Sequence, residues 1–222
     1  MSAIRVALYY LPAAEDPLWA LGSAWLGWDS RRAISLPRPY PAVPARRAAG
    51  YGLHATIKAP MPLATPLDRL QEAARSFLHE QSPATLPPLQ LSLDDGFLSL
   101  RLATTSPALQ ALADGCVLAL DPFRLPYEPA ELAARDRPDY SPRQRQQLAD
   151  WGYPHVFADF VFHMTLSDRL PPENTWLREA QAYFGPSLAL PRRLDSLALL
   201  VQEGPDQPFF CVEEIALGLT PK

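Results

Sequence analysis

Two short segments of this chain carry the same pair of side chains, a histidine followed two residues later by a threonine. The segments are His54-Ala55-Thr56 and His163-Met164-Thr165. Each lies in a run where apolar and polar residues alternate, as in a strand with one buried face. Because residues two apart share a face, both strands are predicted to bury an apolar side and to present histidine and hydroxyl on the other. Whatever fold the chain adopts must give two such strands one covered and one open side.

The rest of the chain alternates predicted strands and helices, which indicates an α+β protein with strand–helix–strand order used twice. We expect one domain over residues 1–222 with two approximate lobes, 1–105 and 106–222. Strands are predicted over residues 5–11, 53–59, 89–93, 97–102, 160–167, 194–201 and 209–217. Helices are predicted to begin at Asp16-Pro17, Thr65-Pro66, Ser106-Pro107 and Ser141-Pro142, and a further one to cover residues 173–184. Residues 121–140 are expected to be irregular.

Composition excludes several classes of protein. The net charge of -4 over 222 residues argues against broad nucleic-acid binding, which needs a basic face. Isolated basic pairs such as Arg31-Arg32 are more often solvated surface charge than phosphate sites. No run of about 18 uncharged apolar residues is present, so no membrane partner is expected. Cys116 and Cys211 each lie in an apolar run, and we interpret both as reduced residues of a cytoplasmic protein.

The duplicated motif suits acid–base chemistry on a phosphate ester. Cleavage of a phosphodiester takes a proton from the attacking oxygen and gives one to the leaving oxygen, and histidine does either near neutral pH. His54 and His163 are therefore the predicted catalytic residues. Thr56 and Thr165 are predicted to donate hydrogen bonds to the phosphate oxygens. Lys58, predicted on the same face as His54, is the third candidate phosphate ligand.

Other interpretations of these residues are weaker. A single histidine in a strand is more often structural than catalytic, and only the duplication favours catalysis here. The chain has no HxH, HExxH or Cys/His cluster, so no metal and no cofactor is expected. It also lacks the GxSxG elbow of serine hydrolases. His79, near the end of a predicted helix, is expected at the surface. His155 precedes the second motif strand, and its role is left open.

The longer strings around the motifs resemble the two-histidine phosphoesterase superfamily, which includes 2′-5′ RNA ligase-like proteins and cyclic nucleotide phosphodiesterases. They are similar to an uncharacterised bacterial branch associated with phosphonate-utilisation operons. The similarity extends over most of the chain, although His155 stands where a tyrosine is expected in relatives. The strings are YGLHATIKAP (51–60), YEPAELA (127–133), SPRQ (141–144), WGYP (151–154) and FVFHMTL (160–166).

The resemblance implies a bilobal α+β fold with duplicated halves around a central groove lined by both motifs, and no requirement for a metal. It favours a phosphodiesterase that hydrolyses a small cyclic phosphate or phosphodiester, such as a nucleoside 2′,3′-cyclic or ribose cyclic phosphate, in phosphonate metabolism. The expected partner is a small phosphorylated ligand or an RNA end. A non-catalytic binding module and an RNA ligase-like activity are the alternatives, and the oligomeric state is left open.

Overall fold

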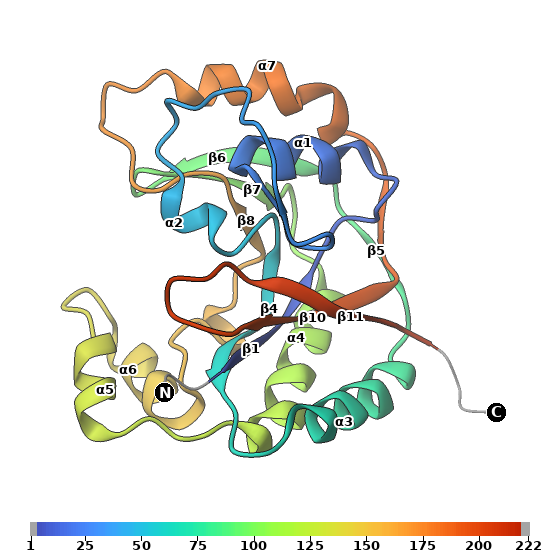
Figure 1. Cartoon of the computed structure of the whole chain (residues 1–222), viewed down its shortest axis with the longest axis vertical. Helices are drawn as coiled ribbons and strands as arrows, with labels where there is room; N and C mark the ends of the chain where they lie inside the picture. Colours follow the sequence, from blue (N-terminus) through green and yellow to red (C-terminus); the bar gives the residue numbers. More distant parts are fainter. Residues whose placement is uncertain (1–3, 219–222) are drawn as a thin grey trace.

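A seven-stranded antiparallel sheet forms the centre of the computed structural model, which describes residues 4–218 (Figure 1). The order of its strands is β11-β10-β1-β4-β8-β7-β6. The predicted α+β class is confirmed. In chain order the strands are β1 (Arg5–Tyr10), β4 (Ala55–Pro62), β6 (Leu89–Asp94), β7 (Phe97–Leu102), β8 (His163–Thr165), β10 (Ser196–Gln202) and β11 (Phe210–Ala216).

Two helix pairs pack against this sheet at opposite ends of the long axis of the molecule (Figure 1). Helices α1 (Pro17–Leu26) and α7 (Trp176–Leu188) contact each other, and α7 contacts β6. Helices α3 (Leu67–His79) and α4 (Pro107–Leu120) also contact each other, and they contact β11 and β4 respectively. The two pairs give the molecule an approximately twofold arrangement.

Shorter elements complete the fold. Helices α5 and α6 lie together beside the lower part of the sheet in Figure 1. The remaining elements are β2 (Trp28–Asp29) with β3 (Ile34–Ser35), β5 (Ala84–Leu86) with β9 (Arg192–Leu194), α2 (Arg46–Ala49), α5 (Pro129–Arg135), α6 (Pro142–Trp151), and the 3-10 turns η1 (Asp121–Phe123) and η2 (Phe157–Asp159).

The helix starts follow the capping chemistry in the sequence. Asp16 accepts the backbone N–H of Leu18, Ser106 that of Leu109, and Ser141 that of Gln144. In each case a proline follows the cap and occupies the first helical position. These three predicted starts are confirmed.

The two halves of the sequence do not fold as consecutive lobes. Along the order of strands, the early strands β1 and β4 follow the last strands, β11 and β10, in one half of the sheet. The other half contains β8, β7 and β6. The helix pairs mix early and late segments in the same way. The expected lobes 1–105 and 106–222 are thus intermixed, because antiparallel pairing brings distant strands together.

Two local predictions were wrong. The second motif strand is only three residues long instead of residues 160–167, since the turn η2 precedes it and Leu166 already bonds to Leu98 outside the regular ladder. The stretch 121–140 is not wholly irregular, because it contains α5, whose capping box joins Glu128 and Glu131. No helix within residues 4–218 is long and apolar enough to span a bilayer.

Candidate active site

The two motif strands are neighbours at the centre of the sheet. The middle residues of the two motifs are direct cross-strand partners in antiparallel register. One step either way, this register sets His54 opposite Thr165 and Thr56 opposite His163. The four side chains therefore form one group on one face of the sheet. The histidines are diagonal neighbours, which are typically about 7–8 Å apart in such a pair of strands. That spacing admits one phosphate between the two rings.

Burial along both strands follows the alternation in the sequence. Ala55 and Met164, which point to the opposite face, are each 0% exposed. The histidines and threonines are all partly exposed. The apolar face thus anchors the two strands in the core, and the four motif side chains on the other face are only partly covered.

Each histidine is held by the same local contact. The Nδ1 of His54 lies 2.9 Å from the backbone oxygen of Gly52, and the Nδ1 of His163 lies 2.8 Å from that of Val161. A carbonyl oxygen only accepts, so each Nδ1 carries the hydrogen. The Nε2 atoms are therefore left as the free nitrogens of both rings, and in the neutral rings they are proton acceptors.

Burial lowers the pKa of both rings and favours their neutral form. The pKa of His54 is lowered to about 4, chiefly by desolvation, and the nearby His163 lowers it further. The pKa of His163 is also lowered, by desolvation and by the charge of Arg101. An anionic phosphate between the rings would act in the opposite direction and favour protonation.

Aromatic side chains form the wall behind His54. The ring of Tyr9 stacks on it with centroids 3.9 Å apart, and Tyr51 lies at 5.9 Å. Tyr51 in turn stacks on Phe209 at 5.3 Å. These contacts fix the plane of the imidazole, as a positioned acid or base requires.

Three residues of this face were missed by the sequence analysis. Ser99 lies opposite Thr165, and Arg101 lies opposite His163. Alternation within residues 97–102 puts Ser99 and Arg101 on one face, but only the strand order shows which face that is. Nothing in the sequence indicated that Tyr9 belongs to the site, because it lies in an apolar run that is typical of any buried strand. The Nε of Arg101 is buried and has no hydrogen-bond partner among the described residues.

His155 lies near one of the two motif histidines, His163. His163 lowers its pKa, although burial lowers it more, so the two rings are near one another. The ring of His155 meets Tyr153 and Tyr140 edge-on, with centroids at 5.4 and 5.9 Å. The residue whose role the sequence left open is thus part of the surroundings of the site.

Lys58 is not on the face of the histidines. Tyr9 pairs with Thr56, so in a regular ladder the preceding residue of β1, Leu8, would pair with Ile57. Leu8 pairs with Lys58 instead, so β4 contains an extra residue at Ile57. Such a bulge reverses the alternation and turns Lys58 to the opposite face. There its ammonium lies 2.7 Å from the carboxylate of Asp121. The prediction that Lys58 shares the face of His54 is wrong, and we no longer include it among the phosphate ligands.

A family model described as "Protein of unknown function (DUF1045)" matches residues 56–210. The match covers most of the chain and includes the second motif. The chain belongs to the DUF1045 family.

Curated relatives of this DUF1045 chain are named "Ribose 1,5-bisphosphate phosphokinase PhnN". The protein from Janthinobacterium sp. (strain Marseille) is 32% identical over 228 residues, which covers 94% of this chain and 49% of that protein. The protein from Laribacter hongkongensis (strain HLHK9) is 35% identical over 212 residues, covering 90% and 48% respectively. The chain therefore spans about half the length of these relatives, and their kinase name does not transfer to it.

Solved structures of LigT from E. coli are similar to the DUF1045 chain. The complex with 3′-AMP is 14% identical, with a TM-score of 0.49, and the match covers 97% of this chain and 99% of that one. The complex with NADP+ is 16% identical with a TM-score of 0.49, covering 98% and 99%. What the two histidines do in this chain is inferred from its own geometry.

Among residues 4–218 there is no group of three or more His, Cys, Asp or Glu side chains placed to hold a metal ion. Both cysteines are free thiols, Cys116 in the core and Cys211 partly buried. The independence from metals and cofactors stays a prediction.

The depressed pKa of His54 predicts a pH-dependent stability. An ordinary histidine titrates near 6.5 and this one near about 4, so between these values the unfolded chain binds more protons than the folded one. Stability from a neutral His54 is present above pH 6.5 and is lost as the pH falls toward 4. When the pH is lowered from 7 to 4.5, the free energy of unfolding should fall in both proteins. We expect the fall to be about 1–3 kcal/mol smaller in His54→Phe than in the parent. Urea titrations of both proteins at the two pH values test this, and equal losses would contradict the assigned pKa.

Proposed function

We propose that this protein is a metal-independent phosphodiesterase of the two-histidine type, which opens a small cyclic phosphate. The observation that carries the proposal is the register of β4 and β8, in which each histidine faces the threonine of the other strand. The site thereby offers two nitrogens and two hydroxyls to opposite sides of one tetrahedral phosphate. A single positioned acid or base contributes about 10²–10⁴-fold to a rate, and this site has two candidates.

His54 is assigned as the general base. Its pKa of about 4 leaves Nε2 unprotonated at neutral pH, so it takes a proton from a water molecule as the water oxygen attacks phosphorus. The bond from phosphorus to one ribose oxygen breaks as the new bond forms. That leaving oxygen takes a proton from the Nε2 of His163, which the bound anion has favoured in its charged form. The product is a phosphate monoester, and the proton on His54 returns to His163 through solvent.

The surrounding donors act on the charge that develops on phosphorus. Thr56 and Thr165 are assigned to donate hydrogen bonds to the two non-bridging oxygens, one from each strand. Arg101, directly opposite His163, brings a guanidinium group to the same end of the site, where it also pairs with Asp94 at 3.0 Å. These groups are fixed by strands of the sheet, so little reorganisation is needed on binding.

The substrate is assigned as a phosphorylated ribose derivative. The curated relatives are named for a kinase of ribose 1,5-bisphosphate, which makes a ribosyl cyclic phosphate a natural ligand for a related chain. The resemblance to the operon-associated branch supports a role in phosphonate metabolism. The net charge of -4 disfavours a long polyanion.

The test is phosphorus NMR with 2′,3′-cyclic nucleotides, a ribose 1,2-cyclic phosphate and a short RNA that carries a 2′,3′-cyclic end. We expect ring opening of the small compounds, equal rates with and without EDTA, and a bell-shaped pH profile. Faster processing of the RNA than of every small compound would favour the RNA-directed alternative. Binding without turnover would make the protein a ligand-binding module, and complete loss on chelation would contradict the metal-free mechanism.

A further inference from the structure

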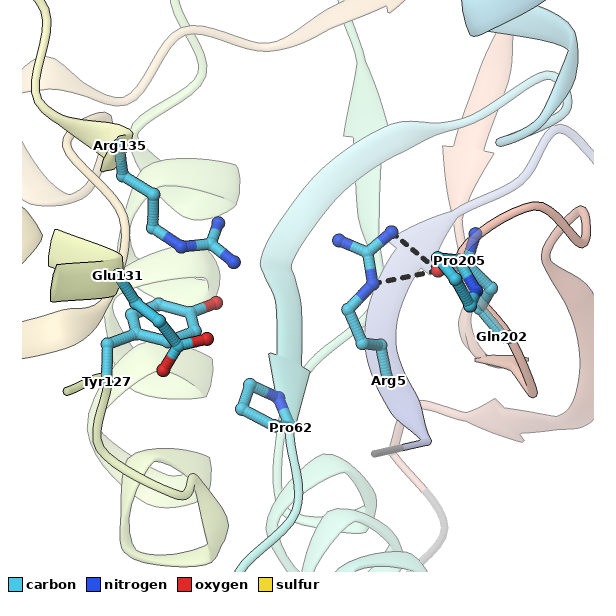
Figure 2. A pocket seen from close by; sticks show the side chains of 8 residues that line it. Arg5, Pro62, Tyr127, Glu131, Arg135, Gln202 and Pro205 are labelled. Carbon is cyan, nitrogen blue, oxygen red and sulfur yellow. Dashed lines mark hydrogen bonds between the residues drawn. The ribbon is translucent and has the colours of Figure 1, made fainter. Parts of the chain in front are cut away.

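A cavity lies on the same face of the sheet as the histidines, at a distance from them. Its volume is about 330 Å³, and Arg5, Pro62, Tyr127, Arg135 and Gln202 are among the residues that line it. Figure 2 shows the guanidinium groups of the two arginines pointing toward each other across the space above Pro62. The cavity is large enough for one phosphorylated group of a small ligand.

Each arginine contacts a neutral side chain instead of a carboxylate. Arg5 donates from Nε and Nη2 to the side-chain oxygen of Gln202, at 2.8 and 2.5 Å. The amide nitrogen of Gln202 in turn donates to the backbone oxygen of Gln207 at 2.7 Å, which fixes the orientation of the amide. Arg135 lies over the ring of Tyr127, 3.9 Å from its centroid. Neither arginine forms an ion pair within residues 4–218.

The charge of the cavity is positive. Glu131 is the single acidic residue of its lining, and its carboxylate accepts the backbone N–H of Glu128 at the start of α5. Two guanidinium groups that face each other across one cavity repel each other, and an anion between them offsets this repulsion. Guanidinium groups bind phosphate oxygens in pairs, with hydrogen bonds roughly twice as strong as neutral ones.

The cavity and the surroundings of His54 lie along the same face of β1. Arg5 and Tyr9 alternate onto the same face of β1, and Tyr9 stacks on His54. Phe209 fills the interval, because the Arg5 guanidinium lies 5.4 Å from its ring and Tyr9 lies 6.1 Å from it. The hydroxyl of Tyr9 is buried there and has no partner among the described residues. Tyr9 lies four positions after Arg5 along β1, a separation on the order of 13 Å.

We propose that the Arg5–Arg135 cavity is a second anion subsite, which binds a phosphate group of the substrate remote from the one between the histidines. The inference rests on the proposed function and narrows it to sugar or nucleoside phosphates with a second, terminal phosphate. A compound with one cyclic phosphate alone fills only the histidine site. The two phosphates then lie toward opposite ends of the face of β1 that carries Arg5 and Tyr9.

Binding tests the subsite independently of turnover. Calorimetry with adenosine 3′,5′-bisphosphate and adenosine 3′-phosphate as probes gives a ratio of affinities for each variant. We expect the parent to bind the bisphosphate about tenfold or more tightly than the monophosphate, and Arg135→Gln to bring the ratio near one. Arg135→Lys should keep part of the preference. The control is Arg69→Gln, an exposed arginine of α3 that pairs with Glu72, which should leave the ratio unchanged.

Kinetics then connects the subsite to the reaction. The two substrates are adenosine 2′,3′-cyclic phosphate and the same compound with an added 5′-phosphate. In the parent, kcat/KM should be about tenfold or more higher for the compound with the 5′-phosphate, and in Arg135→Gln the two values should be nearly equal. An unchanged binding ratio in a folded Arg135→Gln protein would overturn the subsite. If no cyclic phosphate is opened but the binding ratio responds as expected, the subsite stands and the proposed function fails.

Discussion

Replacing His54 or His163 by alanine is expected to lower kcat/KM for a cyclic phosphate by about 10²–10⁴-fold, the usual contribution of a positioned acid or base. Each change removes the Nε2 that handles one of the two protons, and the backbone contact that holds the ring lies outside the reaction path. The double variant should be little worse than either single one, because the two groups act in one concerted step. Initial rates by phosphorus NMR give all three values.

His79→Ala is the matched control, since His79 is the last residue of α3 and belongs to neither motif. It should be as active as the parent. Thr56→Ala and Thr165→Ala each remove one hydrogen bond to a charged oxygen and should cost about 10–100-fold. A folded His54→Ala or His163→Ala protein with parental activity would refute the acid–base assignment. Loss in only one of them would restrict the chemistry to that histidine.

The composition of the active face could be predicted from the sequence, but the pairing of its strands could not. Alternation along residues 53–57 and 160–167 was enough to place each histidine with its own threonine. That β4 and β8 are neighbours depends on long-range pairing, which leaves no local mark on either strand. The same holds for Tyr9, whose stacking on His54 follows from the β1–β4 register.

Lys58 shows where the alternation argument fails. Counting by twos from His54 through Thr56 assumes a regular strand, and the extra residue in β4 breaks that count. Nothing in the local sequence marks the bulge, because Thr56-Ile57-Lys58 is compatible with either geometry. The partner of Lys58, Asp121, follows α4 in the stretch that was expected to be irregular. The helix α5 in that stretch was also overlooked, although Glu128-Pro129 with Glu131 is a capping pattern.

Asp121→Asn is expected to destabilise the fold by about 2–4 kcal/mol, because it leaves two buried cations without their counter-ion. The carboxylate lies 2.7 Å from Lys58 and 2.8 Å from the Nε of Arg124. The two basic side chains are only 4% and 7% exposed. Burial already lowers the pKa of Lys58 and the bond to Asp121 opposes this, so without the carboxylate the lysine should lose its proton more easily. Urea unfolding at pH 7 measures the difference.

Asp136→Asn is the surface control, because its pair with Arg145 is 45% and 41% exposed, and we expect a cost of at most about 1 kcal/mol. Lys58→Met separates the structural role from a phosphate role. It removes the cation but leaves Asp121 bonded to Arg124, so the folded protein should keep its kcat/KM within a few-fold. A fall of about 10²-fold in kcat/KM in Lys58→Met with unchanged stability would show that the lysine does act on the phosphate. If Asp121→Asn were as stable as the parent, the two buried cations would not need the carboxylate. The ion pair would then not explain why Lys58 is stable on the opposite face of β4.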